Sequence, residues 1–486
     1  MFVAIFTLML LSGPVQTDQD VRSPNIVYIL ADDLGWGEVG CYGQKKIRTP
    51  HMDKLSNEGM RFTQHYSGST VCAPSRCVLL TGKHTGHSVV RNNWENGGWG
   101  ADQPEGQYPL PESEETIAEM LKERGYTTAC IGKWGLGGPE STGHPNNQGF
   151  DHFYGYLCQR KAHNYYPAHL WRNGDKHIIN EGEFYSAHQK IEEPLESEEA
   201  YRDLYDREDY APDLMRDEAV EFIRANANRS FFLYYPSPIP HVAIQALQPE
   251  IETYPQEWDR EHYLGQKGYL PHPRPRAAYA AMISRLDSEI GAIVAELEKQ
   301  GIADETIIMV SSDNGATYAG GVDYEFFDSS GPLRGLKGSL YEGGIRVPMI
   351  VRWPGRVAAG STTDHVSAFQ DVMPTIAELT GDRIEDGDGV SFVPTLLDDD
   401  QKQHDVLYWE HGPKQAIRMG RWKGVRTGLR KGDLTVQLYD LDSDASEQRD
   451  VASDHPEILE KIIELMDLEH EPSTVFPLAT IDDVQS

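Results

Sequence analysis

Residues 24–33 have the sequence PNIVYILADD, in which an unbroken apolar run from Ile26 to Ala31 ends in the acidic pair Asp32–Asp33. A strand that is apolar on both faces is typical of a parallel sheet covered by helices on each side. Further strands are predicted at residues 127–131, 231–235, 306–310 and 348–351, and helices at 115–124 and 276–300. This alternation predicts an α/β fold with a large, mostly parallel or mixed sheet flanked by helices.

The composition changes to that of a linker at Asp386–Gly389. Beyond it, short strands are predicted at 406–408, 416–419, 422–425 and 437–439, followed by a closing helix at 456–468. This pattern predicts a smaller C-terminal α+β domain that contains an antiparallel sheet. We place the catalytic domain at 22–397, the C-terminal subdomain at 402–472 and a tail at 473–486.

The stretch from about residue 160 to 275 has poor periodicity and is rich in Tyr, His, Pro and charge. We expect long loops or insertions there, which in such folds often build a substrate site.

The chain has 486 residues, long enough for two or three domains, and 39% of them are hydrophobic, which excludes a wholly disordered chain. Asp and Glu number 76 against 44 Lys and Arg, a formal charge of −32. Because the chain lacks the excess of Lys and Arg that binds phosphates, we expect no nucleic-acid partner. An anionic lipid surface would also repel a chain of this charge.

Phe2–Leu11 is almost wholly apolar, too short to span a bilayer but suited to the core of a signal peptide. We assign residues 1–17 as a signal peptide; a buried strand or short helix is the alternative, because a basic n-region and a clear cleavage site are missing. With no second long apolar run, we expect no stable membrane span and an exported protein, periplasmic or secreted.

Polar groups follow four of the predicted strands: Asp32–Asp33, Lys133, His241 and Asp313–Asn314. Ligands of open α/β sheets bind beyond the carboxyl ends of the strands, so these groups should meet at one edge. Taken singly, each is explained by a turn, a helix cap or a solvated side chain. Together, three carboxylates and an amide need a cation, and their oxygens suit calcium or magnesium better than zinc.

Residues 71–82, VCAPSRCVLLTG, contain the candidate nucleophile Cys72. Pro74 suits a first helical turn, which would place Cys72 at a helix N-terminus, where an anion is favoured. A single cysteine is more often a small buried hydrophobe than a nucleophile. The five cysteines are too few for a disulfide-stapled scaffold, and their odd number suggests another role for at least one of them.

Together these motifs resemble the formylglycine-dependent sulfatases, the arylsulfatase-like family of the alkaline phosphatase superfold, and more narrowly bacterial sulfatases acting on carbohydrates. The resemblance covers nearly the whole mature chain. The matching segments are Pro24–Asp33, Cys72–Arg76, Gly132–Trp134, Pro240–His241, Asp313–Gly315, Gly335–Lys337, Tyr341–Gly344 and Leu438–Leu441. The order Cys-x-Pro-Ser-Arg among the other segments is highly specific, whereas Asp-Asn-Gly alone would be weak.

The resemblance implies that a separate maturation enzyme oxidises Cys72 to formylglycine, whose hydrate attacks the sulfur of a sulfate ester. It implies one calcium ion, with ligands at these positions: Asp32, Asp33, Asp313, Asn314 and an oxygen of modified Cys72. By the same match, Arg76 would hold the hydrate, Lys133 and Lys337 would neutralise the sulfate oxygens, and His241 would protonate the leaving oxygen. Lys133, His241 and Lys337 would thus contact the substrate as well as act in catalysis.

One position departs from the family pattern, because many relatives have histidine directly after Lys-Trp and this chain has Gly135. His87 and His144 are candidates for the role of the missing histidine, on no better ground than that they are present in the chain. The activity is still expected, since Cys72 and the two lysines are present.

Aromatic residues beside hydrogen-bond donors in the insertion give the substrate clue. His163 and Arg172 lie next to Tyr165, Tyr166 and Trp171, a combination that suits a sulfated sugar. A loop packed by its own aromatic rings explains the pattern equally well. The alternative functions are a phosphoester or phosphonate hydrolase of the same superfold, and a catalytically silent binder of sulfated glycans.

Overall fold

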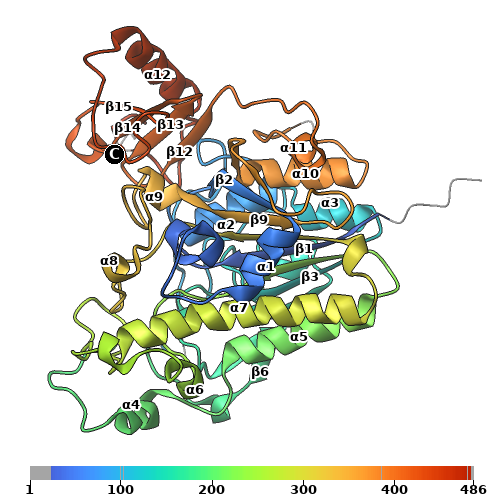
Figure 1. Ribbon diagram of the computed structural model, residues 1–486, viewed down its shortest axis with the longest axis vertical. Coiled ribbons are helices and arrows are strands. Elements are labelled where there is room, and N and C mark those ends of the chain that lie inside the picture. Colours follow the sequence, from blue (N-terminus) through green and yellow to red (C-terminus); the bar gives the residue numbers. More distant parts are fainter. Residues whose placement is uncertain (1–22, 99, 102, 385, 479, 483–486) are drawn as a thin grey trace, which may run out of the picture.

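The computed structural model describes residues 23–98, 100–101, 103–384, 386–478 and 480–482 (Figure 1). The assigned signal peptide at 1–17 lies outside these residues. The described chain forms one large sheet between two layers of helices and a second, smaller sheet near its C-terminal end. The predicted fold class is therefore confirmed.

The large sheet has eleven strands in the order β10-β2-β9-β8-β1-β7-β3-β4-β5-β6, with β11 paired to β2. Their bounds are β1 Asn25–Ala31, β2 Met60–Tyr66, β3 Thr127–Lys133, β4 His152–Tyr156, β5 His169–Arg172, β6 Asp175–Ile178, β7 Phe231–Pro236, β8 Thr306–Ser312, β9 Arg346–Arg352, β10 Ser361–Thr363 and β11 Ser367–Ala368. The central run β8-β1-β7-β3-β4 is parallel, and β9, β5 and β6 pair antiparallel with their neighbours.

The central strand β1 is buried along its whole length because both faces of the sheet are covered. Val27, Ile29 and Ala31 pack into one hydrophobic core, and the alternating residues of β1 pack into the other. The first core is covered by α1 Pro50–Glu58, α5 Ala211–Asn226, α6 Gln248–Ile251 and α7 Pro275–Lys299. The second is covered by α2 Cys72–Thr81, α3 Ile117–Glu123, α10 Val372–Leu379 and α11 Val393–Leu397. Figure 1 shows these two layers below and above the sheet.

The smaller sheet is antiparallel, in the order β12-β13-β14-β15. Its strands are β12 Leu407–Glu410, β13 Gln415–Met419, β14 Trp422–Arg426 and β15 Gln437–Asp440. One face packs against α12, Pro456–Leu468, through Ile462 and Met466. The other face packs against the large sheet through Tyr66 of β2 and Ala368 of β11, so the two sheets share a core.

A buried ion cluster lies where the two sheets meet. The Lys423 ammonium, on β14, is 2.9 Å from a carboxylate oxygen of Glu342 and 2.9 Å from one of Glu447, and all three side chains are buried. Glu342 is the first residue of the short helix α9, Glu342–Ile345, and it also accepts a hydrogen bond of 2.6 Å from the Tyr66 hydroxyl of β2. The C-terminal sheet is thus tied to the chain that follows Lys337.

The prediction of loops across residues 160–275 is wrong for several segments. Besides β5 and β6, this region contains α4, Glu198–Tyr205, and the sixteen-residue helix α5. The buried face of α5 contains Met215, Ala219 and Phe222, and six of its sixteen residues are charged. A further short helix, α8 Tyr324–Phe327, lies near the molecular edge (Figure 1).

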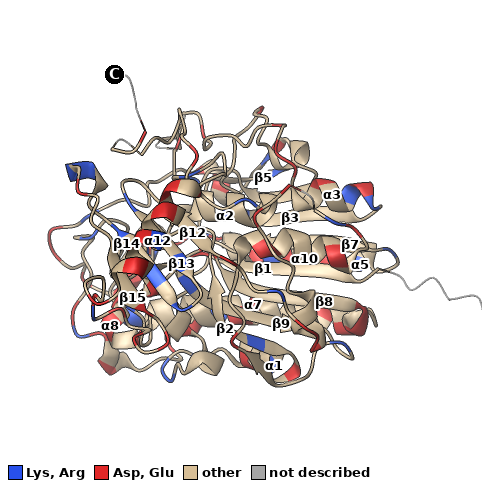
Figure 2. Cartoon of the chain, turned by 90° about the horizontal axis from the view of Figure 1, so that it is seen from above, with Lys and Arg blue, Asp and Glu red and all other residues tan. Residues whose placement is uncertain are grey.

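Within the part of the chain that the structure describes, no helix combines the length and apolar character needed to cross a bilayer. All five cysteines are in that part, and each is a free thiol. Figure 2 shows the acidic residues, in red, distributed over the outer helices and the loops.

Candidate functional site

Four neighbouring parallel strands, β8, β1, β7 and β3, end at the same edge of the large sheet. Asp32 and Asp33 directly follow β1, and Asp313 and Asn314 directly follow β8. Lys133 is the last residue of β3. His241 lies in the loop after β7. The sequence predicts that these residues meet at one edge of the sheet, and the structure brings them together there. All of them are buried.

Cys72 is the first residue of α2, whose ten residues are all buried. Its thiol donates to Asp32 Oδ1 at 3.2 Å. The ammonium groups of Lys133 and Lys337 are each 3.6 Å from Cys72 Sγ. Burial, and secondarily the nearby Asp313, raise the pKa of the Cys72 thiol, so the unmodified side chain is a neutral thiol rather than a reactive thiolate.

Three cations balance the three carboxylates of the site. The Arg76 guanidinium donates to Asp313 Oδ2 at 3.1 and 2.8 Å and lies 3.3 Å from Asp32 Oδ2. Lys133 forms an ion pair with Asp32, and Lys337 Nζ is 2.6 Å from Asp33 Oδ1. Against the opposing effect of burial, Lys133 holds the pKa of Asp32 well below its usual range, so this carboxylate is ionised.

The carboxylate and amide oxygens of the site are suitable ligands for a hard cation. Two buried oxygens, Asp33 Oδ2 and Asn314 Oδ1, have no hydrogen-bond partner among the described residues, although Asn314 Nδ2 donates to Asp33 Oδ1 at 2.7 Å. Ligand atoms of Asp32, Asp33, Cys72 and His241 all lie within 4.8 Å of one another. Buried carboxylate and amide oxygens left without partners are suitable ligands for calcium or magnesium.

His241 is held in a defined orientation. Its Nδ1 donates to the Val242 carbonyl at 2.6 Å, which leaves Nε2 facing the site, 3.7 Å from Asp33 Oδ2. Burial, together with the positive charge of Lys337, lowers the pKa of His241 to about 4. The ring of His163 stacks on that of His241, and His163 Nδ1 is 2.9 Å from His188 Nε2.

His163, which the sequence predicts near the substrate, lies against His241. His188 and Tyr269 were not predicted; their rings pack 4.4 Å apart, centroid to centroid, beside His163. Both residues lie in loops without periodicity or motif, so no signal in the sequence marked them.

Arg172 does not join this group. Its guanidinium forms a two-pronged ion pair with Glu218 of α5, at 2.6 and 2.8 Å, and lies over the ring of Tyr154. The two histidines considered as substitutes at Gly135 also have partners elsewhere. His87 contacts Asp388, and His144 contacts the Asn173 carbonyl.

Gly135 has a φ of +90°, a conformation that favours glycine. A Cβ atom built there would lie 2.5 Å from Nε2 of Gln159, so this amide fills the space that a side chain at position 135 would need. Gln159 is buried, and its Nε2 has no hydrogen-bond partner among the described residues.

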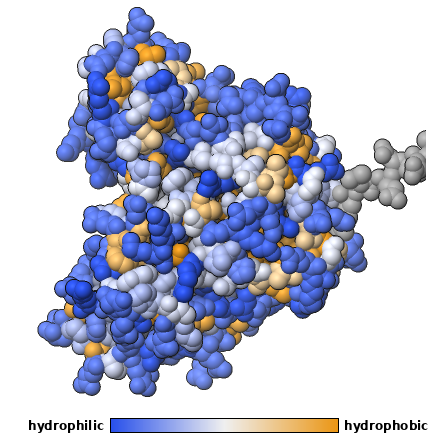
Figure 3. All heavy atoms as spheres, in the orientation of Figure 1, coloured by the Kyte–Doolittle hydropathy of each residue, from blue (hydrophilic) through white to orange (hydrophobic). Residues whose placement is uncertain are grey.

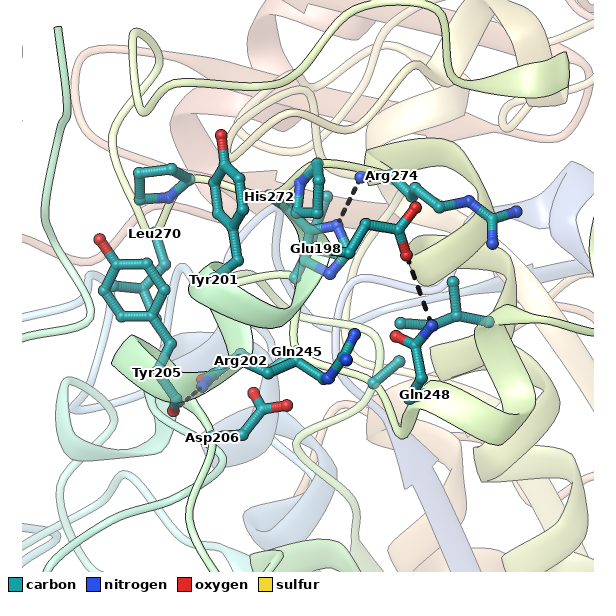
Figure 4. A pocket seen from close by; sticks show the side chains of 15 residues that line it. Glu198, Tyr201, Arg202, Tyr205, Asp206, Gln245, Gln248, Leu270, His272 and Arg274 are labelled. Atoms are coloured by element: carbon teal, nitrogen blue, oxygen red, sulfur yellow. Dashed lines mark hydrogen bonds between the residues drawn. The ribbon is translucent and has the colours of Figure 1, made fainter. Parts of the chain in front are cut away.

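A small cavity in the inserted region is shown in Figure 4, between α4 and the segment 270–274. Its volume of about 30 Å³ admits a water molecule but not a sugar ring. Glu198 accepts a hydrogen bond from Gln248 across it, and its walls contain none of the residues described above. We therefore exclude it as the substrate site.

Comparison with known proteins agrees with this geometry. Residues 24–382 match the family model described as Sulfatase, and residues 336–472 match the one described as N-sulphoglucosamine sulphohydrolase, C-terminal. The chain is 31% identical to human arylsulfatase A, over 91% of this chain and 87% of that one. It is 29% identical to N-acetylgalactosamine-6-O-sulfatase of Bacteroides thetaiotaomicron, over 93% of this chain and 94% of that one.

Among solved structures, the chain is similar to Ps i-CgsB, with a TM-score of 0.75 and 27% identity, covering 93% of this chain and 94% of that one. The same protein has been solved in complex with k-i-k-neocarrahexaose.

Proposed function

The chain belongs to the sulfatase family and is a sulfuric ester hydrolase, and on that premise we propose that it removes sulfate from a sugar or glycan with a formylglycine made from Cys72 and one calcium ion. The observation that most supports this proposal is the position of Cys72. Its sulfur lies 3.6 Å from two lysine ammonium groups and 3.2 Å from Asp32, at the edge where a cation site is available.

The unmodified thiol is poorly suited to the reaction, because burial raises its pKa and keeps it protonated. We infer that a formylglycine-generating maturation enzyme is the partner that converts it. When present, the hydrated aldehyde supplies the attacking oxygen and the calcium ion acts as a Lewis acid towards the sulfate.

The residues that would hold the calcium ion are Asp32, Asp33, Asp313 and Asn314, with an oxygen of modified Cys72. Arg76 fixes two of these carboxylates through its contacts with Asp313 and Asp32 and so keeps their oxygens oriented. We propose that it also contacts the hydrated aldehyde.

Lys133 and Lys337 flank the reacting position and would bind the non-bridging oxygens of the sulfate, where charge grows as the ester bond breaks. His241 can act on the leaving group only through Nε2, because Nδ1–H is committed to the Val242 carbonyl, so Nε2 must first take up the proton that it delivers. Over the whole hydrolysis the S–O bond to the sugar breaks and a new S–O bond forms to the oxygen of one water molecule; one proton of that water ends on the sugar oxygen through His241 Nε2 and the other is left with the sulfate.

The sugar part of the proposal rests on similarity and on the walls of the site. One relative is named for a sulfated amino sugar, and one similar structure contains a carrahexaose. Beside His241 lie the rings of His163 and Tyr269, which offer flat faces and polar atoms near the leaving group.

The test is sulfate release by matured protein from sulfated monosaccharides, oligosaccharides, glycan polymers and an aryl sulfate, with a phosphoester and a phosphonate ester beside them. A Cys72→Ala chain is the control, and peptide mass spectrometry measures the conversion of Cys72. Release from a sugar sulfate that is absent in the control supports the proposal. Release from the aryl sulfate alone, with the aldehyde present, would contradict the sugar assignment.

We also propose that the protein is exported, from the apolar N-terminal segment. Fractionation of the native host would place a processed chain in the periplasm or medium; an unprocessed chain in the cytoplasm would contradict this.

A further inference from the structure

A lysine-lined hollow of about 580 Å³ lies beside the candidate active site, and we call it the lysine hollow. Its walls are Lys267, Tyr318, Tyr324, Lys337, Lys414 and Thr427, together with the loop 338–341. The walls come from both the large-sheet domain and the C-terminal sheet. In Figure 3 the outline of the molecule is indented at the left, between the C-terminal sheet and the part of the chain that contains α8. The volume falls within the range of small-molecule sites.

The charge of the hollow is opposite to that of the chain. The chain has 76 acidic and 44 basic residues, yet the described residues that line the hollow include three lysines and neither Asp nor Glu. A concave surface with one sign of charge attracts ligands of the other sign even when the net charge of the protein opposes them.

The hollow and the site of sulfate chemistry share Lys337. This lysine lines the hollow, and its ammonium lies 3.6 Å from Cys72 Sγ and 2.6 Å from Asp33 Oδ1. The hollow therefore adjoins the position of the sulfate on the side of Lys337, and we infer that it receives the unit joined to the sulfated sugar.

The three ammonium groups are not equivalent. That of Lys337 is paired with Asp33, and that of Lys414 donates to the Gly338 carbonyl at 2.8 Å, which ties the C-terminal sheet to the Lys337 loop. The side chain of Lys267 is exposed, and no described residue forms an ion pair or hydrogen bond with its ammonium. Lys267 thus has its full charge available for a ligand.

An aromatic ring lines the same hollow. Tyr318 is 53% exposed, and its loop is joined to the Lys267 loop by a hydrogen bond of 3.4 Å from Gly320 N–H to the Lys267 carbonyl. A single exposed tyrosine needs no explanation, but a flat ring and an available ammonium in one hollow match the ring and the anionic group of an acidic sugar.

The cationic surface ends on the far side of Lys267. A second, open hollow begins there; Lys267 and Tyr324 line it too, together with Arg260, Arg276 and five carboxylates, Glu257, Asp259, Glu261, Asp323 and Glu325. This boundary would repel further anionic units, so the lysine hollow is suited to one acidic sugar rather than to a long polyanion.

We propose that the lysine hollow binds an acidic sugar joined to the sulfated one, with Lys267 pairing its anionic group and Tyr318 contacting its ring. The substrate class is therefore an oligosaccharide that has a second anionic group next to the sulfate ester, and this inference rests on the proposed sugar sulfatase activity.

The test uses the sulfated monosaccharide that the matured enzyme hydrolyses best, joined through its reducing end to glucose or to glucuronic acid. These two disaccharides differ by one carboxylate. We expect kcat/KM to be about five-fold higher with glucuronic acid, since an exposed ion pair contributes about that factor. The preference should shrink in 0.5 M NaCl, which screens exposed charges.

Lys267→Met should reduce the preference to about one, and Tyr318→Ala should lower kcat/KM for both disaccharides relative to the monosaccharide. Lys461→Met, which removes an exposed lysine from α12, is the matched control and should leave the preference intact. In a Cys72→Ala background, which does not turn over substrate, the affinities for the two disaccharides give the same comparison.

Equal rates on the two disaccharides, or a preference that Lys267→Met does not alter, would overturn the inference. Failure to hydrolyse any sugar sulfate would instead overturn the proposed function.

Discussion

The imidazole ring of His163 lies flat against that of His241, with ring planes 9° apart and centroids separated by 4.6 Å. His163 is in turn fixed by His188, since the Nδ1 and Nε2 atoms are 2.9 Å apart. His241 is thus clamped between its own backbone hydrogen bond and a neighbouring ring. A proton donor must be held in place to act on a leaving group, so this stack defines where Nε2 points.

Removing the His163 ring should therefore lower the rate of the chemical step. We expect His163→Ala to reduce kcat for a small sulfate ester by about ten-fold, because a displaced catalytic group loses its alignment. His163→Phe keeps a flat ring and should lose less. Steady-state kinetics on protein with equal conversion of Cys72 measures both variants. Equal losses in the two variants would mean that stacking is unimportant.

Gly135 should not tolerate a side chain. Gly135→Ala combines the strain of φ +90° with a clash against Gln159. Gly301→Ala is the control: Gly301 has a φ of +73°, but no atom lies within 4 Å of where its Cβ would be. We expect a loss of about 1 kcal/mol in the free energy of unfolding for Gly301→Ala and of about 2–3 kcal/mol for Gly135→Ala. Denaturant titration measures both.

The excess loss at Gly135 should be relieved when Gln159→Ala is added, because the colliding atoms belong to that side chain. A double variant no more stable than Gly135→Ala would show that another group is responsible. Either way, a histidine cannot simply be restored at this position.

Glu289 should make stability depend on pH. It is buried on α7, accepts a hydrogen bond of 3.0 Å from the Tyr235 hydroxyl, and burial raises its pKa from 4.5 to about 7. Between these two values the unfolded chain has released this proton and the native chain still holds it, so unfolding free energy falls as pH rises and levels off above 7. The contribution is about 3 kcal/mol, since each pKa unit corresponds to 1.36 kcal/mol.

We expect Glu289→Gln to lose less free energy of unfolding than the parent between pH 5 and pH 8. Denaturant titration at both pH values measures this difference. Glu298→Gln, at an exposed position of the same helix, is the control and should leave the pH dependence intact. An unchanged slope in Glu289→Gln would contradict the assignment.

Arg172→Ala should leave the choice between sugar and aryl sulfates unchanged, contrary to the expectation from the sequence. Arg172 is occupied by Glu218 on the surface, with 46% of its side chain exposed. We expect the loss in unfolding free energy to stay below about 1 kcal/mol, as for other exposed ion pairs. The ratio of kcat/KM values for the two substrates decides the matter: a selective loss on the sugar sulfate would return Arg172 to the substrate site.

The residues that the sequence analysis placed together correctly share one property, which is that they follow parallel strands. The rule that such strands end at one edge brings Asp32, Lys133 and Asp313 together without any knowledge of the loops. Cys72 was found because its flanking residues form a specific motif at the start of a helix.

What could not be predicted depends on contacts between distant loops. Arg172 faces Glu218, which is 46 residues away, and no local pattern announces that pair. Helix α5 was missed because its charged residues are as many as its buried apolar ones, which weakens the apolar periodicity. The lysine hollow joins residues from 267 to 427, and only the packing of the two sheets brings them together.

The buried cluster of Lys423, Glu342 and Glu447 gives the C-terminal sheet a part in the active site, although it supplies none of the reacting groups. If that sheet came away, Glu342 would lose the Lys423 ammonium and keep only its longer ion-pair contact with Arg346 of β9, and the loop that presents Lys337 would lose Lys414 as well. The two sheets should therefore melt in a single cooperative transition, with one peak of heat absorption. Removal of the C-terminal sheet should abolish folding and catalysis together, because the shared core and the loop of Lys337 both depend on it.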